Sequence, residues 1–85
     1  MLDGNAIGGL LLDVFGTEMT AAEGVCGHCG THGVLAECEV YLGGPGTIVR
    51  CRTCKGLQMV FVEIGGVTCV DLSGLSSLTA GGLTT

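Results

Sequence analysis

Two cysteine pairs are the residues of this chain whose types and spacing are best suited to chemistry. Cys26 and Cys29 form one CxxC pair, and Cys51 and Cys54 form a second. A CxxC pair lets two thiolates of one tight turn bind the same metal ion, and two such turns supply the four sulfurs of a closed tetrahedral site. The sequence therefore predicts a structural metal site with these four ligands and with Zn²⁺ as the expected ion.

Glycine follows each pair. Gly30 comes directly after Cys29, and Gly56 comes two residues after Cys54, with Lys55 between them. Glycine accommodates positive φ and frees backbone N–H groups to turn back toward the sulfurs. We expect both glycines to shape the turns that carry the ligands.

Two histidines could compete with the cysteines as ligands. His28 lies inside the first CxxC pair, and His32 lies three residues after Cys29. Either could replace one sulfur to give a site of three cysteines and one histidine. A histidine inside a CxxC turn normally points outward, so four cysteines remain the predicted set.

Cys38 and Cys69 are left over. Both fall on expected strands, where a free cysteine most often behaves as a small buried hydrophobe. A redox pair or a second, weaker metal site are the alternatives.

The six cysteines could instead form disulfides. The N-terminus has no basic region, and its apolar stretch, residues 7–15, contains Asp13 and is shorter than the roughly 20 residues that a membrane span requires. We therefore expect a cytoplasmic protein without a membrane segment. In that reducing compartment, paired cysteines bind metal more often than they form disulfides.

The composition limits the class of partner. Eight acidic residues face three basic ones, for a formal net charge of −5, and nucleic-acid binding is disfavoured because it depends on clustered cations. At the same time 47% of the residues are hydrophobic and only 13% are charged, more apolar surface than so small a domain hides easily. We expect association with a partner protein or with a second copy, as a homodimer.

The three basic residues, Arg50, Arg52 and Lys55, all lie around the second cysteine pair. Cations close to four thiolates would offset their charge and favour the ionised form. The alternative is a small basic patch that docks an acidic partner.

The sequence predicts no enzyme. Four cysteine ligands leave no open position on a metal, and the chain contains no Ser–His–Asp order, phosphate-binding loop or HExxH motif. No small-molecule substrate is evident. The glutamates are spread along the chain and are interpreted as single solvated charges; they are Glu18, Glu23, Glu37, Glu39 and Glu63.

Iron is the alternative metal. Rubredoxins also bind one iron through two CxxC turns and are small and acidic, and the thiolate ligands alone do not exclude iron. Rubredoxins usually carry proline after the first cysteine of a turn and an aromatic-rich core. This chain has Gly27 and Arg52 at those positions, no Trp, one Tyr and two Phe.

The elements that must position the cysteines begin with a helix over residues 3–16. Asp3 can cap it and Gly16 can end it, while apolar residues recur between them at helical spacing. A strand over residues 34–42 is expected next, with Cys38 and Leu42 on its apolar face and Leu35 on its solvent face. A turn over residues 43–46 should follow it. Further strands are expected over residues 47–50, 57–64 and 67–72, with Gly65-Gly66 as a hairpin turn.

The predicted fold is a small α+β domain, an N-terminal helix packed on an antiparallel zinc-ribbon sheet that resembles rubredoxin. Its single domain covers residues 1–85, with the ribbon over residues 18–72. In the tail, Leu75 and Leu78 are expected to form a single turn, and residues 79–85 are expected to be flexible or to contact another chain.

The chain resembles a family of small uncharacterised actinobacterial zinc-ribbon proteins. The resemblance rests on the opening Met1-Leu2-Asp3-Gly4-Asn5-Ala6 with Asp13-Val14-Phe15-Gly16, on the first cysteine turn, and on Pro45-Gly46 leading into Val49-Arg50-Cys51. It implies a cytoplasmic metal-binding protein, and an accessory role beside oxidoreductases, some of them molybdopterin enzymes.

Overall fold

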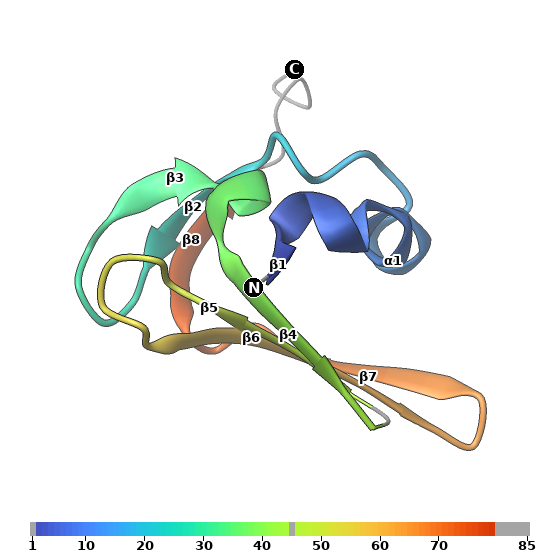
Figure 1. The fold of residues 1–85 in the computed structure, drawn as a ribbon. Helices are drawn as coiled ribbons and strands as arrows, with labels where there is room; N and C mark the ends of the chain where they lie inside the picture. Colours follow the sequence, from blue (N-terminus) through green and yellow to red (C-terminus); the bar gives the residue numbers. More distant parts are fainter. Residues whose placement is uncertain (1, 45, 80–85) are drawn as a thin grey trace.

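The computed structural model describes residues 2–44 and 46–79, which fold into two antiparallel sheets and one short helix (Figure 1). The larger sheet has the strand order β1-β4-β5-β6-β7, and the smaller sheet has the order β3-β2-β8. The elements are β1 (Leu2–Asp3), a 3₁₀ turn (Gly4–Ile7), α1 (Gly8–Phe15), β2 (Glu23–Cys26), β3 (His32–Val34), a 3₁₀ turn (Leu35–Glu37), β4 (Glu39–Gly43), β5 (Gly46–Arg50), β6 (Leu57–Ile64), β7 (Val67–Asp71) and β8 (Leu75–Thr79). This is the expected α+β class.

The N-terminal helix ends at the predicted signal, but α1 begins at Gly8, later than predicted, and Asp3 caps the preceding 3₁₀ turn Gly4–Ile7 instead. The Asp3 side chain accepts a hydrogen bond from the Asn5 N–H at 3.1 Å. Gly16 has φ 74° and its N–H donates to the Leu12 carbonyl at 2.8 Å, which ends α1. The first turn is 3₁₀ rather than α. In the described part of the chain, no helix is long and apolar enough to cross a membrane.

The core lies between α1 and one face of the larger sheet. Leu11 of α1 is fully buried, and Val40, Val49 and Phe61 from three neighbouring strands are almost fully buried. Burial of this kind is worth about 1.5–3 kcal/mol for each such side chain. The core therefore joins the helix to the sheet that ends at the cysteine turns.

The predicted continuous strand over residues 34–42 is wrong. A 3₁₀ turn at Leu35–Glu37 divides it into β3 and β4, which belong to different sheets. Leu35, expected on the solvent side, is buried, whereas Leu42, expected in the core, is 56% exposed. The cause is a close contact with the N-terminus: a Cβ on Gly4 would lie 1.7 Å from the Leu35 carbonyl oxygen.

The predicted turn around Leu75 and Leu78 is also wrong. These residues lie in β8, which pairs antiparallel with β2. Gly74 makes this possible, because its N–H donates to Gln58, its carbonyl accepts from Gly27, and a Cβ on it would lie 1.9 Å from the Leu57 carbonyl oxygen. Thr79, predicted to begin a flexible tail, ends β8, and residues 80–85 lie outside the described part of the chain.

The β6–β7 hairpin follows its glycines. Gly65 and Gly66 have φ of 57° and 83°, and Ile64 pairs with Val67 across the turn. At the expected turn over residues 43–46, Gly43 at the end of β4 pairs with Gly46 at the start of β5, and Pro45 lies outside the described residues.

Candidate metal centre

The structure brings the four predicted cysteines together. The sulfurs of Cys26, Cys29, Cys51 and Cys54 all lie within 4.8 Å of one another. Cys26 and Cys51 are buried, whereas Cys29 and Cys54 are exposed. One ligand of each pair therefore faces the protein and the other faces solvent.

The sulfur spacing fits a tetrahedral ion. The sulfurs of Cys26 and Cys54 are 3.7 Å apart, and those of Cys29 and Cys51 are 3.8 Å apart. A tetrahedron with metal–sulfur bonds of about 2.3 Å has edges of about 3.8 Å. The donor set and its geometry therefore fit one tetrahedrally coordinated ion.

The two cysteine turns, Cys26–Thr31 and Cys51–Gly56, share one hydrogen-bond pattern. In each turn the first cysteine donates its N–H to the residue five positions later, and its carbonyl accepts from the residue four positions later. The bonds are Cys26 N to Thr31 O at 3.0 Å, Gly30 N to Cys26 O at 2.9 Å, Cys51 N to Gly56 O at 2.9 Å and Lys55 N to Cys51 O at 2.9 Å. The site is thus made from the same local structure twice.

Positive φ occurs at equivalent positions of the two turns, and the second position corrects the sequence-based prediction. Gly30 has φ 76° in the first turn, as expected, but in the second turn it is Lys55 that has positive φ, at 65°. Gly56 is needed for a different reason. A Cβ there would lie 2.6 Å from Cδ2 of His28 and 3.1 Å from the Cys54 sulfur.

Neither histidine belongs to the sulfur cluster. The His28 ring turns toward the second cysteine turn, where its Nε2 lies 2.9 Å from the Leu57 carbonyl oxygen. Because a carbonyl can only accept, the Nε2–H donates. His32 is exposed on β3. His28 thus links the first cysteine turn to the strand that follows the second.

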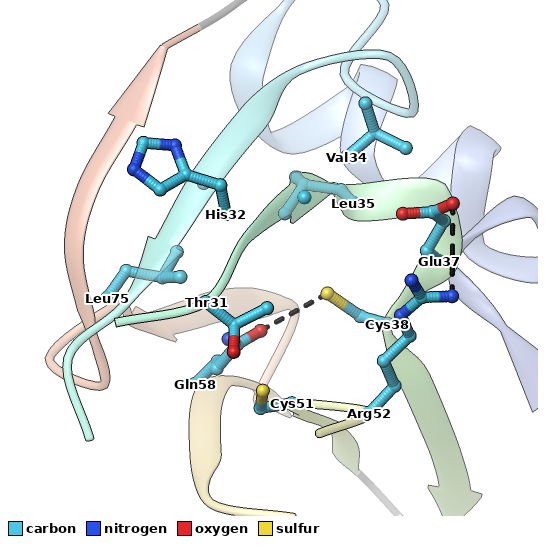
Figure 2. Close-up of a pocket in the computed structure, with 12 residues that line it drawn as sticks. Thr31, His32, Val34, Leu35, Glu37, Cys38, Cys51, Arg52, Gln58 and Leu75 are labelled. Atoms are coloured by element: carbon cyan, nitrogen blue, oxygen red, sulfur yellow. Dashed lines mark hydrogen bonds and ion pairs between the residues drawn. The ribbon is translucent and has the colours of Figure 1, made fainter. Parts of the chain in front are cut away.

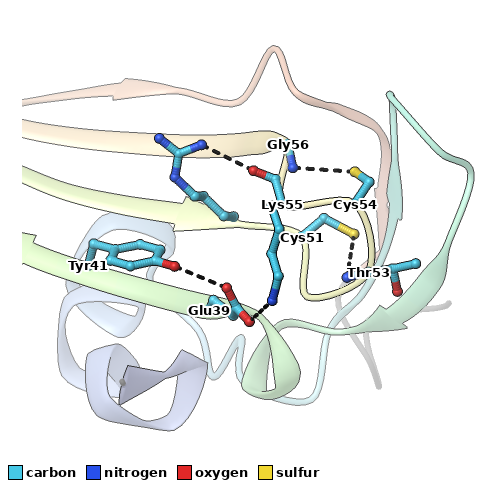
Figure 3. Close-up of polar contacts among 8 residues, drawn as sticks. Glu39, Tyr41, Cys51, Thr53, Cys54, Lys55 and Gly56 are labelled. Carbon is cyan, nitrogen blue, oxygen red and sulfur yellow. Dashed lines mark hydrogen bonds and ion pairs between the residues drawn. The ribbon is translucent and has the colours of Figure 1, made fainter.

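Backbone N–H groups point at the sulfurs. The N–H of His28 lies 3.4 Å from the Cys26 sulfur, that of Thr53 3.4 Å from the Cys51 sulfur, and that of Gly56 3.3 Å from the Cys54 sulfur. Figure 3 shows the last two of these bonds. Such bonds stabilise thiolates without adding a charged group.

The cluster holds its protons unevenly. Burial raises the pKa of Cys26, but hydrogen bonds from the Cys29 and His28 backbone, the Gln58 side chain and Cys54 lower it, and the resulting pKa is about 6. At Cys54 the Gly56 N–H lowers the pKa, while burial and the neighbouring sulfurs raise it to about 11. A first thiolate thus opposes ionisation of the others, and a bound cation would remove that opposition.

Gln58 is a site residue that the sequence analysis missed. It is only 5% exposed on β6, and its Oε1 accepts a hydrogen bond from the Cys38 thiol at 3.2 Å (Figure 2). Its side chain also lowers the pKa of Cys26. A buried amide beside the sulfur cluster therefore contacts the free thiol of Cys38. In the sequence, the indication of this position was a glutamine within the mostly apolar residues 57–64.

The two spare cysteines differ. Cys38 is half-buried in the wall of a pocket that also includes Cys51, and burial, followed by the nearby Cys51 and Glu37, raises its pKa to about 11. Cys69 is exposed, so the prediction that it is buried is wrong. The reason is its position on β7, an edge strand whose five residues are all exposed.

Each of the three basic side chains contacts a neighbouring group. Arg52 lies 3.9 Å from Glu37, and Lys55 forms an ion pair with Glu39, which also accepts from the Tyr41 hydroxyl (Figures 2 and 3). Glu37 and Glu39 are therefore not single solvated charges. Arg50 donates to the Lys55 carbonyl at 3.1 Å, and its guanidinium carbon lies 5.8 Å from the Tyr41 ring centroid.

A comparison with known protein families finds one match. The model of a family described as a family of unknown function, DUF6510, matches residues 1–82. No curated protein and no solved structure matches the chain.

Proposed function

We propose that this chain, which belongs to the family of unknown function DUF6510, is a non-catalytic zinc-ribbon protein that serves as a protein-interaction or accessory module. The observation that carries the proposal is the convergence of four cysteine sulfurs within 4.8 Å from two turns of matching structure. A site with four thiolates suits Zn²⁺, and it has no open position for substrate or water.

The metal serves the fold in this proposal. The site joins β2, at Cys26, to the connection between β5 and β6, at Cys51 and Cys54, and so links the two sheets. A chain of 85 residues has a small core, and structural zinc supplies about 10–16 kcal/mol in zinc-finger peptides at neutral pH. The proposed zinc therefore holds the two sheets together and takes part in no reaction.

The charges support protein rather than nucleic acid as the partner. The net charge is −5, and Arg52 and Lys55 are paired with Glu37 and Glu39. Phosphate recognition needs free, clustered cations. The proposed location is the cytoplasm, where four thiols stay available for metal.

One observation favours the alternative of a rubredoxin-like iron protein that carries electrons. Cys29 and Cys54, one ligand from each turn, are exposed, and an exposed ligand shortens the path for electron transfer to a partner. The same cysteine set would bind iron, so the two proposals differ in the metal and not in the ligands.

The deciding experiment is metal analysis by mass spectrometry of natively purified, untagged protein, with an absorption spectrum of the same sample. One zinc per chain without visible absorption is the expected result. Iron with thiolate charge-transfer bands would replace the zinc proposal with the electron carrier.

A matched pair of variants identifies the site: Cys51→Ser should lose the metal, and Cys69→Ser, an exposed cysteine outside the cluster, should retain it. Metal-free protein that is fully folded would overturn both proposals.

A further inference from the structure

Strand β7 leaves one edge of the larger sheet open. It pairs with β6 on one side, and no other strand of residues 2–44 and 46–79 pairs with it on the other. All five of its residues, Val67–Asp71, are exposed. Figure 1 shows the β6–β7 hairpin extending away from the smaller sheet. A row of backbone N–H and C=O groups on such an edge is a template for another strand.

This edge lacks the usual protection against pairing. Val67–Asp71 contains no proline, lysine or arginine, and its only charge is Asp71 at the last position. The other five-residue edge strand, β8, differs in chemistry, because its exposed side chains are Ser76, Ser77 and Thr79. Of these two edges, β7 is the one that exposes apolar side chains along its length.

Apolar surface continues from this edge across the sheet face that points away from α1. Ile64 and Val67, paired at the hairpin tip, are 65% and 63% exposed. Farther along, Tyr41, Ile48 and Val60 are paired side by side across β4, β5 and β6 and line a shallow groove. A strand added beside β7 would therefore extend an apolar face as well as a backbone ladder.

The hairpin determines which backbone groups of β7 face outward. Gly65 and Gly66 both have positive φ, which is the type I′ turn that closes a hydrogen-bonded pair, here Ile64 and Val67. In an antiparallel ladder hydrogen-bonded residues alternate, so Val67, Cys69 and Asp71 bond to β6. The N–H and C=O groups of Thr68 and Val70 therefore point to the open edge.

We propose that β7 is a dimerisation edge, at which a second copy of the chain adds its own β7 antiparallel about a two-fold axis through Cys69. Thr68 of each copy then bonds to Val70 of the other, and all the outward groups of both strands are used. Cys69 faces Cys69 of the second copy in a non-hydrogen-bonded pair, and Val67 faces Asp71. This inference names the partner in the proposed interaction role, a second copy of the chain, and in that respect it rests on the proposed function.

A second copy fits this edge because the two-fold register about Cys69 places no two charged residues of the strands opposite each other. The net charge of −5 opposes self-association in general. At this edge, however, the one acid of the strand, Asp71, faces the apolar Val67 rather than its own copy.

The test is sedimentation equilibrium of the metal-loaded full chain over a wide concentration range, with variants that report the register. Wild type should show a monomer–dimer equilibrium. Val67→Asp places two carboxylates opposite each other at both ends of the paired strands, and should raise the dimer dissociation constant about tenfold or more. Val67→Lys should keep the dimer, and Val67→Asp combined with Asp71→Lys should restore it. Within one chain these positions are about 13 Å apart along the strand, so rescue reports contact between copies.

Cross-linking gives a second, independent measurement. The thiol oxidant diamide should join Cys69 to Cys69 in wild type, because non-hydrogen-bonded pairs bring Cα atoms to about 4.5 Å, within disulfide range. Cys69→Ser should remove that cross-link. A chain that stays monomeric at every concentration, or a dimer indifferent to all Val67 variants, would overturn the inference. Metal content measured on the same samples separates this outcome from failure of the zinc proposal, since a metal-free dimer would contradict only the latter.

Discussion

The Nε2–H of His28 donates to the carbonyl of Leu57 at 2.9 Å, and this bond joins the first cysteine turn to the strand that leaves the second. The ring lies over Gly56, where a Cβ would come within 2.6 Å of it. Loss of a group that orients the ligands of a metal site typically costs about ten- to a hundredfold in metal affinity. We therefore expect His28 to act as a positioning residue for the sulfur cluster.

Replacing His28 by alanine should weaken metal binding while leaving all four sulfurs in place. The Leu57 carbonyl loses its donor and the two turns lose their direct link, so we expect zinc affinity to fall about tenfold or more. Competition with a chelator measures the affinity. His32→Ala is the control, because His32 is exposed on β3 and outside the cluster. Equal affinity for both variants would show that the bond does not support the site.

Gly56→Ala should destabilise the protein by about 1–3 kcal/mol, because the new methyl group must displace the His28 ring or the Cys54 sulfur. Denaturant unfolding of the metal-loaded protein measures the loss. Part of that loss should disappear when Gly56→Ala is made in the His28→Ala background, where the ring is absent. A cost that is the same in both backgrounds would contradict contact with His28 as the cause.

Gln58→Leu should lower the affinity for metal, because the Gln58 side chain that lowers the pKa of Cys26 is lost and the half-buried Cys38 thiol loses its acceptor. Loss of an outer group of this kind costs about ten- to a hundredfold in affinity. Cys38→Ala is the matched control, since it removes the other end of the same contact and leaves Gln58 in place. If Gln58→Leu binds metal as tightly as Cys38→Ala does, the prediction is wrong.

Alkylation by iodoacetamide should distinguish the two spare cysteines. In metal-loaded protein at neutral pH, Cys69 is exposed and should react, whereas Cys38 should react slowly because burial raises its pKa.

The same shift has a consequence for stability. The pKa of Cys38 in the folded protein lies above the usual value of 9.0. The stability that comes from holding this thiol neutral is therefore fully present below pH 9 and is lost as the pH rises toward 11. Mass mapping of the labelled peptides and a pH series of Cys38→Ala against wild type test both statements.

Removal of the metal should unfold the sheets. The cysteine turns connect β2 to the β5–β6 connection, and the four sulfurs repel one another as thiolates without a cation. Excess chelator should abolish the strand signal in circular dichroism, and added zinc should restore it. Retained strand signal and compactness in excess chelator would show that the apolar core suffices.

Local patterns predicted the elements whose determinants are close in sequence. The existence and the end of the N-terminal helix follow from its apolar spacing and Gly16, the 3₁₀ turn before it follows from the Asp3 cap, and the β6–β7 turn follows from Gly65-Gly66. The interruption at Leu35–Glu37 was not predictable, since it depends on the packing of Gly4 against Leu35. Strand β8 was missed for the same reason, because its partner β2 lies about fifty residues away in the chain.

The sequence by itself determined which residues can bind a metal, because a CxxC pair brings two sulfurs together through a single local turn. Only the structure showed that Cys26 and Cys51 are buried while Cys29 and Cys54 are exposed, that His28 bonds to Leu57, and that Gln58 bonds to Cys38. Each of these depends on atoms from segments distant in sequence. Such contacts form only once the sheets have packed, and no local pattern records them.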